Sequence, residues 1–355
     1  MPARPNDWQA LIRELTRRAA AAGQPINGTF ELTSRCNLAC SMCYVREAEC
    51  NRPVRDRELS AEQWVAVAKE GVEAGLLFLL LTGGEVLVRP DFFDIYAPLA
   101  RLGLYVTVFT NGTLITAEAA ARFAESPPNR LEITLYGASE KVYEAVTGVP
   151  GSFRRCLAGI EHLLRAGVCL GLRSTLCRTN IEELPAMEEM ARRWGLRFAH
   201  GALLTPRRDG RESLAPRLRL PAEACVELES SDPITAEGWC EALREPRGEE
   251  EGAFYCGAGK SAFFIGPSGE MNTCIDLPRP QASVTALGFR GAWEEVRRFV
   301  LSVEPSPVCS SCPDRRACSS CPAHSLLESG DLQGPVPYLC EIARERKRRF
   351  GRKTA

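Results

Sequence analysis

Three cysteines with a spacing suited to metal binding lie close together near the start of the chain. Cys36, Cys40 and Cys43 form a C-x3-C-x2-C sequence, and Tyr44 follows directly. Three thiolates this close in sequence converge readily on one metal centre, and an iron–sulfur cluster held by only three of them keeps one iron open for another molecule. A zinc site would need a fourth ligand, for which Cys50 is available. The spacing therefore favours an iron–sulfur cluster and leaves zinc as the alternative.

A second set of cysteines lies in the last third of the chain, again with short, regular intervals. The intervals read C-x12-G-x4-C from Cys256 to Cys274, then C-x2-C-x5-C-x2-C after a gap, and then one further cysteine. The set comprises Cys256, Cys274, Cys309, Cys312, Cys318, Cys321 and Cys340. So many thiols in one region suit either a zinc-ribbon module or additional iron–sulfur clusters.

Other side chains that could contact a bound molecule lie at or near the ends of expected strands. Thr82-Gly83-Gly84-Glu85 follows a buried strand; glycines permit positive φ and close backbone approach, and a carboxylate accepts hydrogen bonds from an ammonium group. Asn111 and Thr134 stand at the ends of the next two strands, and Arg173 lies in the strand after those. Turn chemistry is the alternative for Asn111 and Thr134, and a surface or domain contact is the alternative for Arg173.

The composition bears on where the protein works. The chain of 355 residues contains 16 cysteines, and 44 Lys and Arg against 45 Asp and Glu give a net charge of −1, which argues against a nucleic-acid partner. The N-terminus has no apolar signal region, and the longest apolar run, 76–81, is far shorter than the roughly 18 residues of a membrane span. We therefore expect a cytoplasmic protein without a membrane partner, in which reduced thiols bind metal.

The elements that must position these residues alternate along the chain between residues 28 and 204. Apolar runs predict strands at 30–32, 76–81, 104–109, 131–135, 168–176 and 196–200, and helical patterns lie between them. Near-continuous apolar strands separated by helices suit a parallel sheet covered by helices, closed into a barrel or left as an open wound sheet. In both cases the active residues lie at the carboxyl ends of the strands.

The pattern divides the chain into five segments. We expect an N-terminal helix in 1–26, the strand–helix region in 27–204, a proline- and arginine-containing linker in 205–252, a cysteine-rich domain in 253–345 and a basic tail in 346–355. The cysteine-rich domain contains a predicted β-hairpin at 263–265 and 271–273.

The cysteine triplet, followed by an aromatic residue and then by the Gly-Gly-Glu sequence, resembles the signature of radical S-adenosylmethionine (SAM) enzymes. The resemblance implies an α/β fold of the partial (β/α)6 TIM-barrel type. It implies that Cys36, Cys40 and Cys43 hold a catalytic [4Fe–4S] cluster whose open iron binds SAM, which is cleaved to a 5′-deoxyadenosyl radical. The residues it implies as SAM contacts are Tyr44, Gly83, Gly84, Glu85, Asn111, Thr134 and Arg173.

The C-terminal cysteines are similar to those of the SPASM domain, which is appended to many radical SAM enzymes and binds two auxiliary [4Fe–4S] clusters. By position, Cys256, Cys274 and Cys321 would hold the cluster nearer the active site. The outer cluster would be held by Cys309, Cys312, Cys318 and Cys340. Some members have a fourth inner ligand where this chain has Ala262, so an inner cluster with an open iron is expected. This part of the chain is expected to fold as a small α+β domain.

The resemblance implies an oxidoreductase that modifies a precursor peptide in the biosynthesis of a ribosomally made natural product (RiPP). The expected product carries a thioether, C–C or C–O cross-link or another oxidative modification. The alternatives are a small-molecule substrate such as a tetrapyrrole, a protein residue as in sulfatase maturation, or a zinc-stabilised interaction protein without activity. For acid–base chemistry the candidates are His200, Asp276 and Glu132.

The same resemblance suggests the partners. They are the precursor peptide and a reductant such as flavodoxin or ferredoxin. About 27 residues precede the first strand, too few to fold a leader-binding domain. The leader is therefore expected to bind either a separate leader-binding protein or the catalytic domain itself.

Overall fold

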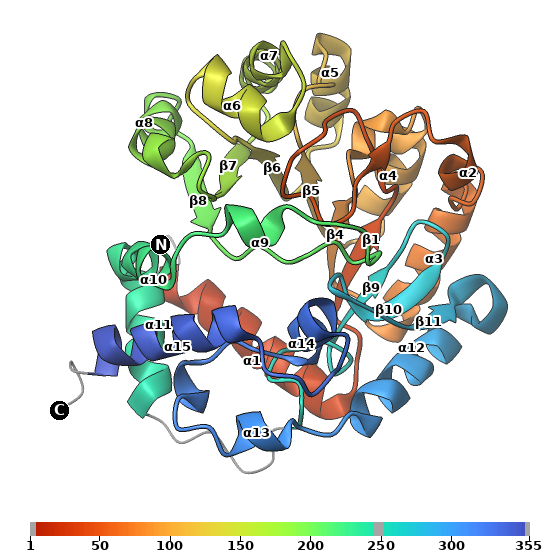
Figure 1. Ribbon diagram of the computed structural model, residues 1–355. Helices are drawn as coiled ribbons and strands as arrows, with labels where there is room; N and C mark the ends of the chain where they lie inside the picture. The colour runs from red at the N-terminus through yellow and green to blue at the C-terminus, as the bar shows by residue number, and fades with distance from the viewer. Residues whose placement is uncertain (1–4, 245–251, 352–355) are drawn as a thin grey trace.

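One large sheet organises the molecule. The computed structural model describes residues 5–244 and 252–351, and in this part of the chain nine strands form a single sheet in the order β11-β10-β9-β1-β4-β5-β6-β7-β8 (Figure 1). The first six strands of this sheet, in sequence order, are β1 (Asn27–Glu31), β4 (Phe78–Thr82), β5 (Tyr105–Thr110), β6 (Arg130–Thr134), β7 (Leu170–Thr175) and β8 (Arg197–Gly201). They pair in parallel, each with the next. The predicted strand–helix alternation and the α/β fold are therefore confirmed.

Helices follow these strands and cover the outer side of the sheet (Figure 1). They are α3 (Ala61–Ala74), α4 (Phe92–Ala100), α5 (Ala117–Glu125), α6 (Glu140–Thr147), α7 (Ser152–Arg165) and α8 (Leu184–Arg193). Their apolar faces and the strands form one core that contains the fully buried rings of Trp64, Tyr96 and Phe123. Helix α3 begins at a capping box between Ser60 and Gln63 and ends at Gly75 in the left-handed conformation, as the sequence predicts.

The cysteine-rich segment shares this sheet with the strand–helix region. The predicted hairpin is formed by β9 (Ala262–Ile265) and β10 (Glu270–Cys274), and β11 (Leu277–Ser283) extends it. Strand β9 also pairs in parallel with β1, so the sheet runs across the expected boundary between the two segments. Phe263 of β9 packs against Phe30 of β1, with ring centroids 6.4 Å apart. The cysteine-rich segment is thus anchored to the catalytic sheet by backbone pairing and by core contacts.

The remaining helices lie around this framework. They are α1 (Pro5–Ala22), α2 (Arg52–Arg55), α9 (Ala215–Leu218), α10 (Ala222–Ser231), α11 (Pro233–Arg244), α12 (Val284–Ser302), α13 (Pro307–Ser310), α14 (Pro322–Ser329) and α15 (Pro337–Phe350). Short 3-10 turns occur at Val86–Val88, Ile181–Glu183 and Arg315–Ala317. A small second sheet pairs β2 (Arg35–Cys36) with β3 (Glu47–Ala48) in the loop that carries the cysteine triplet.

Two segments of the chain have more structure than the sequence suggests. The expected linker contains α10 and α11, which pack against α15. The expected basic tail begins inside α15, where Arg346 is 7% exposed and its guanidinium pairs with Glu229 at 2.6 Å. The start of the tail is therefore part of a packed helix, while Arg352 and Lys353 lie outside the described residues. None of the described helices is long and apolar enough to cross a membrane.

Candidate active site

A cavity of about 240 Å³ opens at the carboxyl ends of the parallel strands. Its walls come from the loops after β1, β4 and β5 and from the ends of β6 and β7. Of the residues predicted to bind the catalytic cluster and SAM, those that line it are Cys36, Cys40, Cys43, Tyr44, Gly83, Gly84, Asn111, Thr134 and Arg173. Residues from five separate parts of the sequence thus meet at one edge of the sheet, as expected for a parallel α/β fold.

The three cysteines of the triplet are free thiols that face this cavity. Burial raises the pKa of Cys36 to about 12 and also raises the pKa of Cys40. Neutral buried thiols are unreactive, whereas metal ligation requires and stabilises the thiolate. In the described part of the chain no three His, Cys, Asp or Glu side chains lie close enough to hold one metal ion. The three cysteines line one cavity, in which a cluster bound by three thiolates would fit.

The two glycines after β4 allow the close approach of two backbone segments. A Cβ atom on Gly83 would lie 2.3 Å from the carbonyl oxygen of Thr33, and one on Gly84 would lie 2.4 Å from that of Arg35. The amide of Gly84 donates to the Thr33 carbonyl at 2.7 Å. Neither glycine has a positive φ. Close approach is therefore the reason for glycine here, and it brings the β4 loop against the loop that carries the cysteines.

Glu85 has a different role from its neighbours, because it does not line the cavity. Its carboxylate accepts hydrogen bonds from the Thr110 hydroxyl at 2.7 Å, the Asn111 amide at 2.6 Å and the Leu87 amide at 3.1 Å. The side chain is 1% exposed, and burial raises the pKa of its carboxyl group. In the structure Glu85 links the β4 loop to the end of β5, and its contact with a ligand ammonium group stays a prediction.

Asn111 and Arg173 contribute polar groups to the cavity. The Asn111 side-chain amide lies 3.8 Å from the Cys36 sulfur and donates to the Asn37 side chain at 2.9 Å. The Arg173 guanidinium lies over the ring of Phe109, 4.2 Å from its centroid. This contact holds the Arg173 guanidinium in the wall of the cavity. The alternative for Arg173 was a surface or domain contact.

A second cavity of about 270 Å³ adjoins the first. The residues shared by the two are Cys43, Tyr44, Tyr136 and Thr175. The second cavity extends to Leu204, Thr205, Ile275 and Asp276. Tyr136 is not among the predicted site residues. Its position just past the end of β6 places it at the carboxyl edge of the sheet, where active residues are expected.

Of the three acid–base candidates, only Asp276 lines this second cavity. Its carboxylate accepts a hydrogen bond from the Thr205 hydroxyl at 3.4 Å, and burial raises its pKa while nearby His324 opposes the shift. Glu132 is 4% exposed and pairs with Arg130 and Arg197. His200 lines a separate cavity.

The C-terminal cysteines influence one another electrostatically in two sets, whereas their roles as cluster ligands stay a prediction. Cys256, Cys274 and Cys321 lie within electrostatic range of one another, since Cys321 raises the pKa of both other thiols after the larger effect of burial. The second group surrounds Cys340. Burial has the largest effect in raising the pKa of Cys340, and Cys318, Cys309 and Cys312 raise it further. Cys274 ends β10 and precedes Asp276 by two residues. The first group therefore lies directly behind the second cavity.

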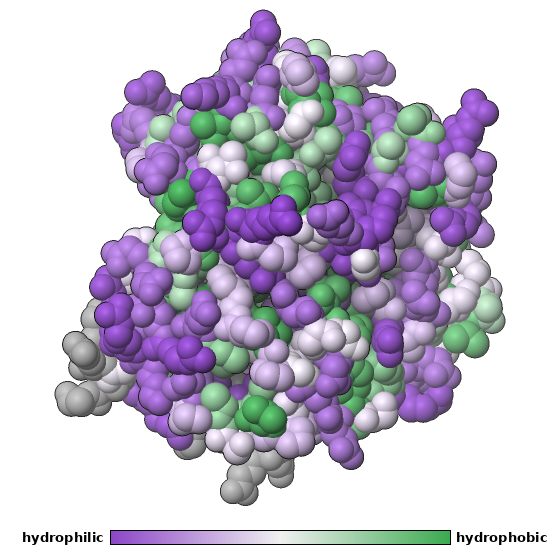
Figure 2. Space-filling view, in the orientation of Figure 1, coloured by the Kyte–Doolittle hydropathy of each residue, from purple (hydrophilic) through white to green (hydrophobic). Residues whose placement is uncertain are grey.

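The segment at the start of the expected linker or bridging region forms this side of the site. Residues 203–211, here called the strap, leave β8 and cross in front of the strands toward the cysteine loop (Figure 1). The Arg208 amide donates to the Tyr44 carbonyl at 3.2 Å, and its guanidinium pairs with the fully buried Glu31. Arg211 pairs with Glu47 in the same loop. Figure 2 shows hydrophilic side chains gathered along this crossing segment.

Comparisons with known proteins agree with this arrangement. Residues 30–191 match the Radical SAM superfamily. A relative named mycofactocin maturase MftC, from Mycolicibacterium smegmatis, is 30% identical over 89% of this chain and 83% of its own length. An AdoMet-dependent heme synthase from Methanosarcina barkeri is 28% identical over 87% of this chain and 94% of its own length.

Solved structures support the fold. The crystal structure of Streptococcus suis SuiB bound to S-adenosylmethionine has a TM-score of 0.70 at 15% identity, covering 96% of this chain and 82% of that chain. The structure of native anSMEcpe with bound AdoMet has a TM-score of 0.64 at 14% identity, covering 93% and 98% of the two chains. These matches confirm the partial TIM-barrel fold, with a cysteine-rich C-terminal region added to it.

Proposed function

The chain belongs to the radical SAM superfamily and is an enzyme, and we propose that it is a peptide maturase that introduces an oxidative cross-link or a related modification into a precursor peptide. The observation that carries this proposal is the pair of adjoining cavities. The first is lined by the cysteine triplet, and the second reaches Asp276, two residues from Cys274. A substrate group in the second cavity would lie between the triplet and the first group of C-terminal cysteines.

The residues present fit the cofactors that this function needs. Cys36, Cys40 and Cys43 would hold one [4Fe–4S] cluster. Two auxiliary clusters would be held by Cys256, Cys274 and Cys321, and by Cys309, Cys312, Cys318 and Cys340. Together with SAM, these groups would supply hydrogen-atom abstraction and one-electron oxidation.

The chain's own side chains would bind and orient the reactants. The first cavity offers SAM the polar side chains of Asn111 and Thr134 and the cation of Arg173. In the second cavity, Tyr44 and Tyr136 provide apolar walls, and Asp276 offers an acceptor for a substrate O–H or N–H group. The strap covers this space and limits the access of water to it.

The second cavity has a volume of about 270 Å³, which accommodates a single amino-acid side chain of a peptide substrate.

Action on a tetrapyrrole is the second candidate function. It is favoured by the similarity to the Methanosarcina barkeri heme synthase, which extends over 94% of that protein. The two candidates predict different products, so one experiment separates them.

The test uses the anaerobically reconstituted enzyme with SAM and dithionite. Synthetic versions of any short peptides found to be encoded beside its gene and an iron tetrapyrrole are offered in parallel. Products are followed by mass spectrometry together with 5′-deoxyadenosine. We expect 5′-deoxyadenosine and a peptide that has lost two hydrogens. The variant with Cys36, Cys40 and Cys43 all replaced by Ala should form neither. Conversion of the tetrapyrrole with the peptides unchanged would overturn the proposal.

The proposed partners can be tested in the same assay. Flavodoxin or ferredoxin should replace dithionite as the source of electrons. If a separate leader-binding protein presents the substrate, adding it should lower the peptide KM without changing 5′-deoxyadenosine formation in the absence of peptide.

A further inference from the structure

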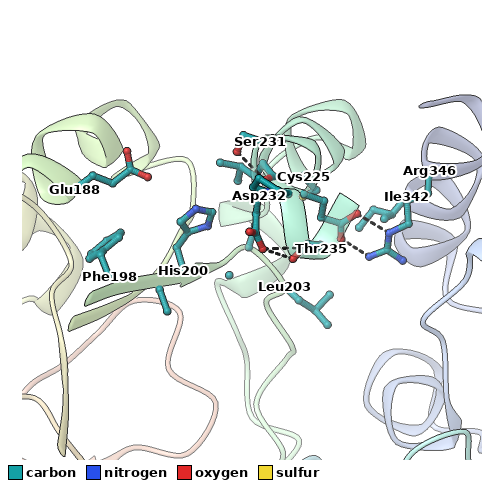
Figure 3. A pocket seen from close by; sticks show the side chains of 16 residues that line it. Glu188, Phe198, His200, Leu203, Cys225, Ser231, Asp232, Thr235, Ile342 and Arg346 are labelled. Carbon is teal, nitrogen blue, oxygen red and sulfur yellow. Dashed lines mark hydrogen bonds and ion pairs between the residues drawn. The ribbon is translucent and has the colours of Figure 1, made fainter. Parts of the chain in front are cut away.

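A cavity of about 610 Å³ lies beside β8, outside the site described above. Its walls come from β8, from residues that follow it, and from α10, the start of α11 and α15. Figure 3 shows Glu188, His200 and Asp232 around this space, with Phe198 on the same strand as His200.

The strand next to this cavity has one open backbone edge. Strand β8 is at the end of the sheet, with β7 as its only partner in the described part of the chain. The Gly201 carbonyl accepts a hydrogen bond from the Leu176 amide, on the β7 side. Because the direction of backbone groups alternates along a strand, those of Phe198 and His200 point to the opposite, open side.

This open edge lacks the usual protection against pairing with another strand. Edge strands are commonly blocked by proline, lysine, a bulge or a covering helix. Strand β8 reads Arg-Phe-Ala-His-Gly, three of its five residues are exposed, and its free side faces the cavity. The edge is therefore available for an extended peptide segment.

The cavity beside β8 and the proposed substrate site share one lining residue. Leu203, two residues beyond the end of β8, lines both the 610 Å³ cavity and the 270 Å³ cavity. A segment lying along β8 would thus have one end directed at the space between the two cysteine groups.

The charges in the cavity indicate the kind of segment that fits. Glu188 and Asp232 place two carboxylates on its walls. The Thr235 hydroxyl, and more weakly His200, lower the pKa of Asp232 and so keep it ionised. The cation on the wall, Arg346, is already engaged by Glu229 at 2.6 Å and 2.8 Å. Asp232 accepts hydrogen bonds from Ile234 and Thr235, but neither carboxylate forms an ion pair with a described residue. This unpaired negative charge complements a basic side chain.

We propose that the edge of β8 and the adjoining cavity bind an extended segment of the peptide substrate as an added strand, with a Lys or Arg side chain directed at Glu188 and Asp232. This inference rests on the proposed function, because it takes the occupant to be the substrate peptide. Main-chain hydrogen bonds to β8 would supply affinity, and the two carboxylates would supply selectivity.

The first test separates the backbone of β8 from its side chains. His200→Pro removes the outward N–H while leaving the bonds to β7 in place, a position where proline is tolerated. His200→Ala removes the side chain and keeps the N–H. Binding of the fluorescein-labelled precursor peptide is measured by anisotropy. His200→Pro should weaken binding by roughly tenfold, as expected for loss of one to two hydrogen bonds, and His200→Ala should weaken it much less.

The second test concerns the charges and does not depend on a proline substitution. The double variant Glu188→Gln/Asp232→Asn keeps the shape of both side chains and removes their charge. Its matched control is Glu294→Gln, an exposed carboxylate on α12. The double variant should bind the peptide several-fold more weakly, and the loss should vanish for a peptide whose basic residues are replaced by Gln.

The outcomes distinguish this inference from the proposed function. Each variant is checked for 5′-deoxyadenosine formation without peptide, which should stay at the wild-type level. If the His200→Pro variant and the charge variant both modify the peptide normally, the proposed binding site at the edge of β8 is wrong. The proposed maturase function is then unaffected. If no peptide is bound or modified by the wild type, both fail. A concentration-dependent dimer that buries β8 would show that a second copy occupies this edge, and would also overturn the inference.

Discussion

At the scale of single residues, the absence of a side chain at Gly84 is a requirement of the site. A Cβ there would lie 2.4 Å from the Arg35 carbonyl oxygen and 2.7 Å from that of Ser34, both on the loop that holds the cysteine triplet. These are backbone atoms, so an added methyl group would displace the loop itself.

We therefore predict that Gly84→Ala lowers the free energy of unfolding by roughly 1–3 kcal/mol and weakens SAM binding by at least about tenfold. Isothermal titration with SAM and denaturant unfolding measure the two effects. Gly238→Ala in α11 is the control, since a Cβ there meets no atom within 4 Å. Equal SAM affinity in the two variants would contradict the role given to the close approach at Gly84.

Asn111 is expected to influence the reduction potential of the cluster bound by the cysteine triplet. Its amide is directed at the Cys36 sulfur at 3.8 Å. Hydrogen bonds to ligand sulfurs help set the potential of a cluster. Asn111→Ala should lower the reduction potential by roughly 20–60 mV, the one-electron equivalent of a typical hydrogen bond.

A redox titration followed by electron paramagnetic resonance measures the shift at Asn111. Thr113→Val serves as the comparison, because the Thr113 hydroxyl donates to the side-chain oxygen of Asn111 at 2.6 Å and acts on the sulfur only through Asn111. A potential that moves equally in both variants would indicate a general disturbance of the loop, contrary to a direct amide–sulfur contact.

At the scale of elements, local signals predicted most of the strands and helices, and long-range contacts account for what was missed. Ser60, Gln63 and Gly75 mark the ends of α3 within the sequence itself. The pairing of β9 with β1 joins segments far apart in the chain and has no local signature. The same holds for Glu85, since only the fold shows that its carboxylate is used by the end of β5.

The strap illustrates a second limit of sequence reasoning. Its prolines and arginines predicted a linker or bridging segment but not a partner for Arg208, which forms an ion pair with Glu31, a residue that is 0% exposed. Arg208→Gln should therefore destabilise the protein by roughly 3 kcal/mol, because it leaves a buried carboxylate without its cation. The double variant Glu31→Gln/Arg208→Gln should recover much of this loss, as measured by denaturant unfolding.

The pH dependence of the Arg208→Gln variant has a definite sign. Burial raises the pKa of Glu31, and Arg208 opposes that shift. Without Arg208 the folded-state pKa rises further above the unfolded value, so the penalty is present at high pH and is relieved as the pH falls toward the unfolded value of about 4.3. The stability difference from wild type should thus shrink as the pH is lowered from neutrality toward that value. A constant difference would show that the lost cation does not act on Glu31.

At the scale of the whole molecule, SAM cleavage and oxidation of the peptide are expected to depend on different cysteines, the triplet for the first step and the C-terminal cysteines for the second. Cys274→Ala should remove about four irons per chain and abolish peptide modification, while 5′-deoxyadenosine formation continues. Cys340→Ala should also lower the iron content, through the other group. Iron analysis and Mössbauer spectroscopy measure the loss. Cys169→Ala, at an exposed thiol outside both groups, is the control.

The pairing of β9 with β1 also has a consequence for how the chain is made. Strand β1 leaves the ribosome early, but the partner for one of its edges is residues 262–265, which are synthesised more than 200 residues later. During that interval the growing chain carries an unpaired strand edge, which can pair with other chains and aggregate. Expression of the protein should therefore depend on chaperones and benefit from slow synthesis at low temperature, and a chain ended before β9 would keep that edge exposed permanently.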